Sequence, residues 1–222
     1  MPPRLTLDLD LSGYSRQISN RAWQGAAVVS VTIAVLGTLI ALGVALLVGY
    51  PLARFRTRGG RLLLYALLAT MLIPPIAVAI PLLYLVIDLG IRGTVPGLVL
   101  INAAFWSPIL IWLVRGAFMR VPIELERAAR IDGCSRLGAV FRVSLPAVAP
   151  VIAAATAIVF IGIWNDFVFS AVAGGPETRT LPRFLGESVS PRFNDFAARI
   201  VLTVAPCVAL VAFLRSRILA LG

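Results

Sequence analysis

Long apolar runs and short polar segments alternate along this chain of 222 residues. A helix needs about 20 apolar residues to cross the roughly 30 Å hydrocarbon core of a bilayer. Five runs meet or approach this length and predict membrane spans at about 24–48, 62–87, 94–114, 147–172 and 198–215. We therefore expect an all-α protein, a polytopic transmembrane helical bundle whose membrane domain covers residues 22–220. Residues 1–21 are polar and are expected to form an external N-terminal segment.

The second predicted span contains Pro74, Pro75 and Pro81. Proline removes a backbone hydrogen bond and kinks or breaks a helix. In hydrocarbon, the freed carbonyl groups need protein or a water-filled cavity beside them. We therefore expect a kinked or broken helix that is buried in the bundle and does not face lipid.

The distribution of charge indicates a topology. The chain is 59% hydrophobic and 14% charged, whereas soluble domains are about a quarter charged. All 20 basic residues are arginine, and the net charge is +10. Alternating spans place twelve on one side (Arg54, Arg56, Arg58, Arg61, Arg115, Arg120, Arg127, Arg130, Arg136, Arg142, Arg215 and Arg217) and eight on the other (Arg4, Arg16, Arg21, Arg92, Arg179, Arg183, Arg192 and Arg199). The positive-inside rule puts the twelve in the cytoplasm, the N-terminus outside and the C-terminus inside. Topology and attraction to lipid headgroups explain the basic excess, so no nucleic-acid partner is expected.

Two missing residue types exclude much chemistry. The sequence contains no lysine and no histidine. The phosphate-binding loop GxxxxGK needs a lysine, and the usual serine, cysteine and zinc sites need histidine. Cys134 and Cys207 lack CxxC spacing and indicate neither a disulfide nor a metal site. We expect no enzyme activity and no cofactor or metal in this chain.

The charged segment at 121–146 interrupts the apolar pattern between the third and fourth spans. Pro122 suits the first turn of a helix, and the helix dipole favours Glu124 and Glu126 in that turn. Gly133 predicts a left-handed C-cap, and Ser135 predicts the cap of a second short helix. Because a helix this short is marginal in water, it needs a surface on which to dock.

The segment "PIELERAARIDGCSRLGAVFRVSLPAVAP" resembles the EAA loop of ABC transporter permeases, whose pattern is approximately EAA, three residues, Gly, about nine residues and I-x-LP. The resemblance is closest to the maltose-type sugar permeases of binding-protein-dependent importers, and within them to one of the two permease halves. The stretches "YPLARFRTRGGRLLLYALLATMLIPPIAVAIPLLYL", "WNDF" and "TLPRFL" resemble further blocks of that subfamily. Together these blocks extend the resemblance over about residues 23–215.

The resemblance implies the type I ABC importer permease fold, with a coupling loop at 121–146 that docks on a separate ATPase subunit. Carried over by motif position, the coupling residues are Ala128, Ala129, Gly133, Leu145 and Pro146. Arg127 stands where the motif has an acid, and Glu126 or Asp132 is expected to substitute, with Glu124 beside them. The implied partners are a second permease subunit, two ATPase subunits that bind ATP and Mg, and an external binding protein. The implied location is the plasma (inner) membrane of a bacterium.

A second candidate site lies near the outer end of the fourth span. Asp166 is flanked by Trp164 and Asn165, and Asn102 lies in the third span. A carboxylate within a membrane is a functional candidate because its burial in lipid is costly. An aromatic face and amide groups suit a sugar, so these four residues are candidates for the substrate pathway. The alternative is an interfacial Asp166 that anchors or caps its span.

Several alternatives stay open at this stage. The leading function is the import of a sugar or related solute; glycerol phosphate or another polyol is an alternative, since Arg179, Arg183 and Arg192 are external. A secondary carrier or channel is a third possibility, against which the charged loop argues. The family usually has six spans, so either a first helix is encoded upstream of Met1 or the protein is a shorter variant.

Overall fold

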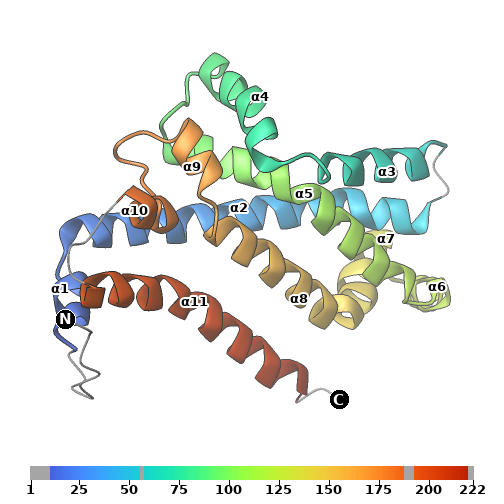
Figure 1. Cartoon of the computed structure of the whole chain (residues 1–222). Coiled ribbons are helices and arrows are strands. Elements are labelled where there is room, and N and C mark those ends of the chain that lie inside the picture. Colours follow the sequence, from blue (N-terminus) through green and yellow to red (C-terminus); the bar gives the residue numbers. More distant parts are fainter. Residues whose placement is uncertain (1–10, 56–57, 188–192, 220–222) are drawn as a thin grey trace.

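The computed structural model describes residues 11–55, 58–187 and 193–219, and all secondary structure in these ranges is helical. Figure 1 shows the long helices side by side, with shorter helices near the ends of the bundle. The elements are α1 (Ser12–Ile18), α2 (Arg21–Arg54), α3 (Gly60–Thr70), α4 (Pro75–Asp88), α5 (Val95–Met119), α6 (Ile123–Ile131), α7 (Arg136–Ala139), the π-helical turn η1 (Val140–Ser144), α8 (Leu145–Trp164), α9 (Val168–Ala173), α10 (Leu181–Glu187) and α11 (Phe193–Leu219). The predicted all-α class is confirmed.

Four helical stretches within the described residues are long and apolar enough to cross a membrane. The bent α3–α4 pair raises this number to five if the pair forms one span. The predicted polytopic bundle is therefore confirmed. At 34 residues, α2 is about 50 Å long, so its ends extend beyond a hydrocarbon core of roughly 30 Å.

Helix α2 is the centre of the bundle and packs against α5 and α8. Its inner face carries the small residues Ala34, Ala41 and Ala45, all fully buried. Farther along, a Cβ atom at Gly49 would lie only 3.0 Å from the carbonyl oxygen of Ile111 in α5. Small side chains let helix backbones approach closely, which is the usual basis of helix association in membranes.

The second predicted span is broken, as its prolines indicate. Helices α3 and α4 meet at an angle of 104°. Pro74 lies in the break and Pro75 opens α4, whereas Pro81 is accommodated within α4. The expected burial is not found within this chain, because Leu62, Leu72 and other apolar side chains of the pair are exposed. The prolines thus predict the break but do not indicate which surface covers it.

The helices at the fourth and fifth predicted spans, α8 and α11, have other bounds than the prediction gave. Helix α8 ends at Trp164, whereas the fourth span was expected to continue to 172. The chain turns at Asn165–Phe167 and begins the separate short helix α9, because the carboxylate of Asp166 accepts hydrogen bonds from the amides of Phe169 and Ser170. Helix α11 starts at Phe193, before the expected position 198, and continues through Pro206.

The two ends of the bundle have different characters (Figure 1). The turn between α2 and α3 and the helices α6 and α7 lie at one end, which we call the basic end because it carries Arg54, Arg58, Arg61, Arg127 and Arg130. Helices α1, α9 and α10 lie at the opposite end. There, Arg16 of α1 forms an ion pair of 2.8 Å with Asp195 of α11 and fastens the N-terminal helix to the last one.

Candidate functional site

The charged segment at the basic end folds as a helix, a glycine turn and a second short helix. Pro122 precedes α6, and Gly133 ends it with a φ of +91°. A Cβ at Gly133 would have no described atom within 4 Å, so the backbone conformation, not crowding, favours glycine there. Ser135 caps α7 by accepting a hydrogen bond of 3.0 Å from the amide of Gly138. The predicted pattern of this segment is confirmed.

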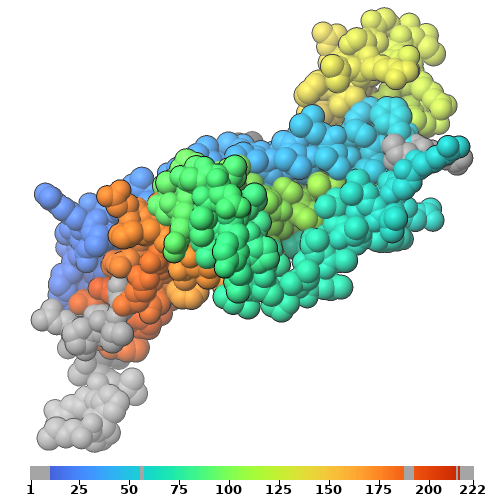
Figure 2. All heavy atoms as spheres, turned by 90° about the horizontal axis from the view of Figure 1, so that it is seen from above, coloured from blue at the N-terminus to red at the C-terminus, as the bar shows by residue number. Residues whose placement is uncertain are grey.

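The segment exposes several apolar side chains. Ile131 and Leu125 of α6 are 86% and 47% exposed, and Leu137 of α7 is 70% exposed. Ala128 of α6 is exposed as well. Figure 2 shows the segment, in yellow and yellow-green, as a lobe that projects beyond the bundle. Exposed apolar side chains gathered on a projecting element mark an interaction surface.

Glu126 of α6, by contrast, is buried. Its Oε1 accepts hydrogen bonds from Arg54 Nε at 2.8 Å and from Ser144 Oγ at 2.5 Å. Its Oε2 accepts one from the Tyr50 hydroxyl at 3.0 Å. Arg54 Nη2 completes an ion pair of 2.7 Å. The carboxylate is thus held by α2 and by the turn that precedes α8.

The other predicted coupling residues occupy several positions around the segment. Glu124, Ala128, Asp132, Gly133 and Pro146 are exposed, whereas Ala129 and Leu145 are half-buried. Arg127, at the motif's acid position, is exposed at a groove of about 660 Å³ between α2 and the segment. Arg130 and Arg136 also line this groove. Of the three acids predicted for the coupling loop, Glu126 is therefore buried within this chain, whereas Glu124 and Asp132 are exposed.

At the opposite end, the four predicted pathway residues have distinct surroundings. Asn102 is buried in α5, donates to the Leu98 carbonyl at 3.0 Å and lies within interaction distance of the Asp166 carboxyl. Trp164 is buried and donates its indole N–H to the carbonyl of Thr203 in α11 at 3.0 Å. Asn165 is exposed, and Asp166 is half-buried at the start of α9. The structure therefore brings Asn102 and Asp166 together, while the polar group of Trp164 is occupied by α11.

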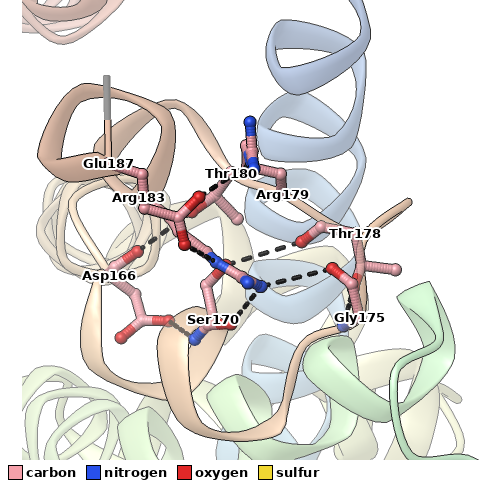
Figure 3. A network of polar contacts seen from close by, with 8 residues as sticks. All are labelled: Asp166, Ser170, Gly175, Thr178, Arg179, Thr180, Arg183 and Glu187. Carbon is pink, nitrogen blue, oxygen red and sulfur yellow. Dashed lines mark hydrogen bonds and ion pairs between the residues drawn. The ribbon is translucent and has the colours of Figure 1, made fainter. Parts of the chain in front are cut away.

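A polar network adjoins these residues and fastens the loop before α10 (Figure 3). Arg183 Nη1 donates to the carbonyls of Ser170 at 2.9 Å and Gly175 at 3.2 Å, and its Nε donates to Glu187 at 2.7 Å. The hydrogen bond from Arg183 lowers the pKa of the Glu187 carboxyl. Arg179 also pairs with Glu187, at 2.9 Å. The side chains of this loop thus hold its backbone in one shape.

The same loop is joined to the membrane helices. The amide of Leu181 donates to Ser30 Oγ of α2 at 2.7 Å. The hydroxyl of Thr178 lies 3.3 Å from the carbonyl oxygen of Gly93, just before α5. Neither the network around Glu126 nor the network around Arg183 was predicted from the sequence. The "TLPRFL" block and the arginines of the α2–α3 turn were the available signals, but their partners lie far away in the chain.

Comparison with known proteins agrees with this architecture. Residues 37–221 match the family model described as "Binding-protein-dependent transport system inner membrane component". A probable ABC transporter permease of Sinorhizobium fredii is 31% identical over 225 residues, which cover 100% of this chain and 80% of that protein. The trehalose transport system permease SugB of Mycobacterium tuberculosis is 31% identical over 227 residues, covering 99% and 81%. The arabinooligosaccharides transport system permease AraQ of Halalkalibacterium halodurans is 31% identical over 217 residues, covering 96% and 76%.

Solved structures show the same fold. A chain of a bacterial ABC transporter that imports the acidic polysaccharide alginate superposes with a TM-score of 0.79 at 23% identity, covering 96% of this chain and 81% of that chain. A chain of the MetNI methionine ABC transporter, in an inward-facing conformation, superposes with a TM-score of 0.69 at 16% identity, covering 96% and 97%. The expected importer permease fold is confirmed.

Proposed function

Because this chain belongs to the family of binding-protein-dependent transport system inner membrane components, we propose that it is the membrane-spanning permease subunit of an ATP-driven importer for a sugar or related carbohydrate. Membership in this family excludes the alternative of a stand-alone secondary carrier or channel. The family consists of transport components, so we assign ATP hydrolysis to a separate ATPase subunit.

The observation that carries the proposal is the projecting lobe at the basic end. Its exposed apolar side chains, including Leu125, Ala128 and Ile131, need a partner surface. The left-handed turn at Gly133 lets the chain reverse direction below the membrane and return to α8. We assign this lobe as the coupling loop that docks on an ATPase subunit, which binds ATP and Mg. The chain has no lysine with which to build a phosphate-binding loop of its own.

The remaining partners follow from the architecture of a binding-protein-dependent importer. We propose a heterodimer with a second permease subunit, two ATPase subunits and one external binding protein. The apolar faces of the bent α3–α4 pair and of α11 are exposed in the isolated chain, and they suit contact with lipid and with the second permease.

Orientation is assigned from charge. Short loops rich in arginine favour the cytoplasmic side, so the basic end with the coupling loop lies in the cytoplasm. The end with α1, α9 and α10 then faces the outside, where the binding protein delivers solute. This gives the described chain an external N-terminal helix and a cytoplasmic end of α11.

An uncharged carbohydrate fits the outer end better than a phosphate ester does. The side chain of Arg183 is 15% exposed; its Nη1 donates to two carbonyls and its Nε donates to Glu187. Arg179 is paired with the same carboxylate. Glu187 offsets one of these two positive charges, and both guanidinium groups are already held in ion pairs. Arg192, the third external arginine considered as a phosphate ligand, lies outside the described residues.

For the substrate pathway, we propose Asn102, Asn165 and Asp166 as polar groups at the outer end of the translocation route. Asn165 is exposed and Asp166 is half-buried, so both are accessible to a solute. Trp164 is assigned to the same region, where its stacking on Phe160 supports the wall of the route.

Reconstitution tests the function directly. The chain would be co-expressed with a second permease, an ATPase and a binding protein of the same family of importers, and assembled in proteoliposomes. Trehalose, arabinooligosaccharides and glycerol phosphate would be offered as labelled probes. We expect uptake of a carbohydrate that requires both ATP and the binding protein. Uptake that proceeds without the ATPase, or of glycerol phosphate alone, would contradict the proposal.

A further inference from the structure

One carboxylate joins three segments at the point where the bundle meets the coupling loop. Glu126 belongs to the first half of α6, Tyr50 and Arg54 belong to the last part of α2, and Ser144 ends the π-helical turn before α8. The partners of Glu126 are 76, 72 and 18 residues away in the chain. The carboxylate is therefore a junction between the loop and two membrane helices.

The junction is enclosed by the protein. The side chains of Arg54 and Glu126 are 6% and 11% exposed. Arg54 also donates from Nη1 to the carbonyl of Val121 at 2.9 Å, which fixes the chain just before α6. A buried ion pair tolerates the loss of one partner poorly, because an uncompensated charge is left behind. Arg54 thus fixes the position of α6 relative to α2.

On either side of this junction, the connections of the loop are turns. Arg120–Pro122 separates α5 from α6, and Asp132–Ser135 separates α6 from α7. A force applied to the exposed face of α6 would bend these turns unless a side-chain contact held α6 to the bundle. Glu126 supplies such a contact from the buried side of α6.

We propose that Glu126 is a positioning residue that transmits movement of the docked coupling loop to α2 and α8, and that it does not itself bind the ATPase. This inference rests on the proposed function, because it concerns how ATP hydrolysis drives the membrane helices. It divides α6 into two faces. Leu125, Ala128 and Ile131 contact the ATPase subunit, while Glu126 connects α6 to the membrane helices α2 and α8.

The experiment compares binding, ATP hydrolysis and transport in the complete reconstituted importer. Glu126→Gln keeps the shape of the side chain and removes its charge. We expect the variant to retain the ATPase subunit on co-purification and to hydrolyse ATP, while the solute transported per ATP falls about tenfold. Arg54→Gln should give the same defect. The double variant should be no worse than either single one, because both remove the same link.

Two further variants keep the test informative if the charge variants fail to assemble. Tyr50→Phe removes one hydroxyl from the junction and preserves the packed ring, so it should lower the transport-to-hydrolysis ratio by a smaller factor. Asp88→Asn, at an exposed acid at the end of α4, serves as the matched control and should leave the ratio unchanged.

The outcomes separate this inference from the function on which it rests. If the wild-type complex fails to bind an ATPase or to use ATP, the proposed function is wrong. If the wild type transports solute and Glu126→Gln keeps the wild-type ratio, the positioning role is wrong. If Glu126→Gln instead releases the ATPase while Tyr50→Phe has no effect, Glu126 acts as a docking acid and the inference is overturned.

Discussion

Trp106 of α5 lies against the backbone of Gly162 in α8, so that a Cβ atom at position 162 would overlap the indole carbons Cζ2, Cη2 and Cε2. The indole also packs edge-to-face on Phe105, with ring centroids 5.7 Å apart. The absence of a side chain at Gly162 therefore fixes how closely two membrane spans approach. Small residues let membrane helices approach closely, and here the indole occupies the space that glycine leaves open.

Gly162→Ala should consequently destabilise the bundle, although alanine is the better helix former. The added methyl group must displace a large ring in a packed interface, which costs about 1–3 kcal/mol. Thermal unfolding of the purified protein in detergent would show a lowered midpoint. Gly116→Ala in α5 is the matched control, since a Cβ there meets no described atom within 4 Å. An equal midpoint for both variants would contradict the packing argument.

Local features of the fold were predictable where one residue determines the backbone. Pro74 and Pro75 predicted a break because proline cannot donate a helical hydrogen bond. Gly133 predicted a reversal of the chain, and the structure places it at a φ of +91°. The outer end was less predictable. The "WNDF" stretch continues an apolar run, and capping was considered for Asp166 only at the end of its own span. The sequence did not indicate that Asp166 starts a new helix by accepting hydrogen bonds from the amides of Phe169 and Ser170.

The orientation of Glu126 shows the limit of sequence reasoning at the candidate site. The motif identifies an acid in the coupling segment, but not which side of α6 it faces. That depends on Tyr50 and Arg54, which the sequence assigns to a different element. The arginines of the α2–α3 turn predicted a topology through their number. The specific task of Arg54 appears only once α2 and α6 are placed side by side.

Replacement of Gly133 by leucine tests the coupling turn. A non-glycine residue in the left-handed region costs about 1–2 kcal/mol, and the turn should open or shift. We expect membrane insertion to persist, ATPase binding to weaken and uptake to be lost. Immunoblots of membranes, co-purification of the ATPase subunit and solute uptake measure the three properties.

Gly59→Leu provides the control for conformational strain alone. Gly59 has a φ of +84°, and a Cβ there would also meet open space, but it lies between α2 and α3. The two variants therefore share the backbone penalty and differ in location. If Gly59→Leu and Gly133→Leu impaired uptake equally, general strain and not the coupling turn would explain the loss.

Arg183→Met should loosen the loop between α9 and α10. The change removes donors to Ser170, Gly175 and Glu187 while retaining an apolar stem of similar length. Loss of hydrogen bonds to buried carbonyls costs about 1–3 kcal/mol. We expect faster limited proteolysis within this loop and weaker stimulation by the binding protein. Arg179→Met should have a smaller effect, because its side chain is 42% exposed. A protected loop in Arg183→Met would contradict the assigned role.

Asp166 allows its structural and transport roles to be separated by two substitutions. Its carboxylate accepts two amide hydrogen bonds at the start of α9, so Asp166→Ala should destabilise this end by about 1 kcal/mol, as the loss of a helix cap does. Asp166→Asn keeps one of the two oxygen acceptors, since its amide nitrogen cannot accept a hydrogen bond, and removes the negative charge. We expect Asp166→Asn to lower the thermal midpoint less than Asp166→Ala does, and to lower carbohydrate uptake because it removes the charge that we assign to the route beside Asn102. Uptake by the complete importer and thermal unfolding would be measured on the same preparations. Wild-type uptake by Asp166→Asn, together with a lowered midpoint in Asp166→Ala, would restrict Asp166 to capping α9.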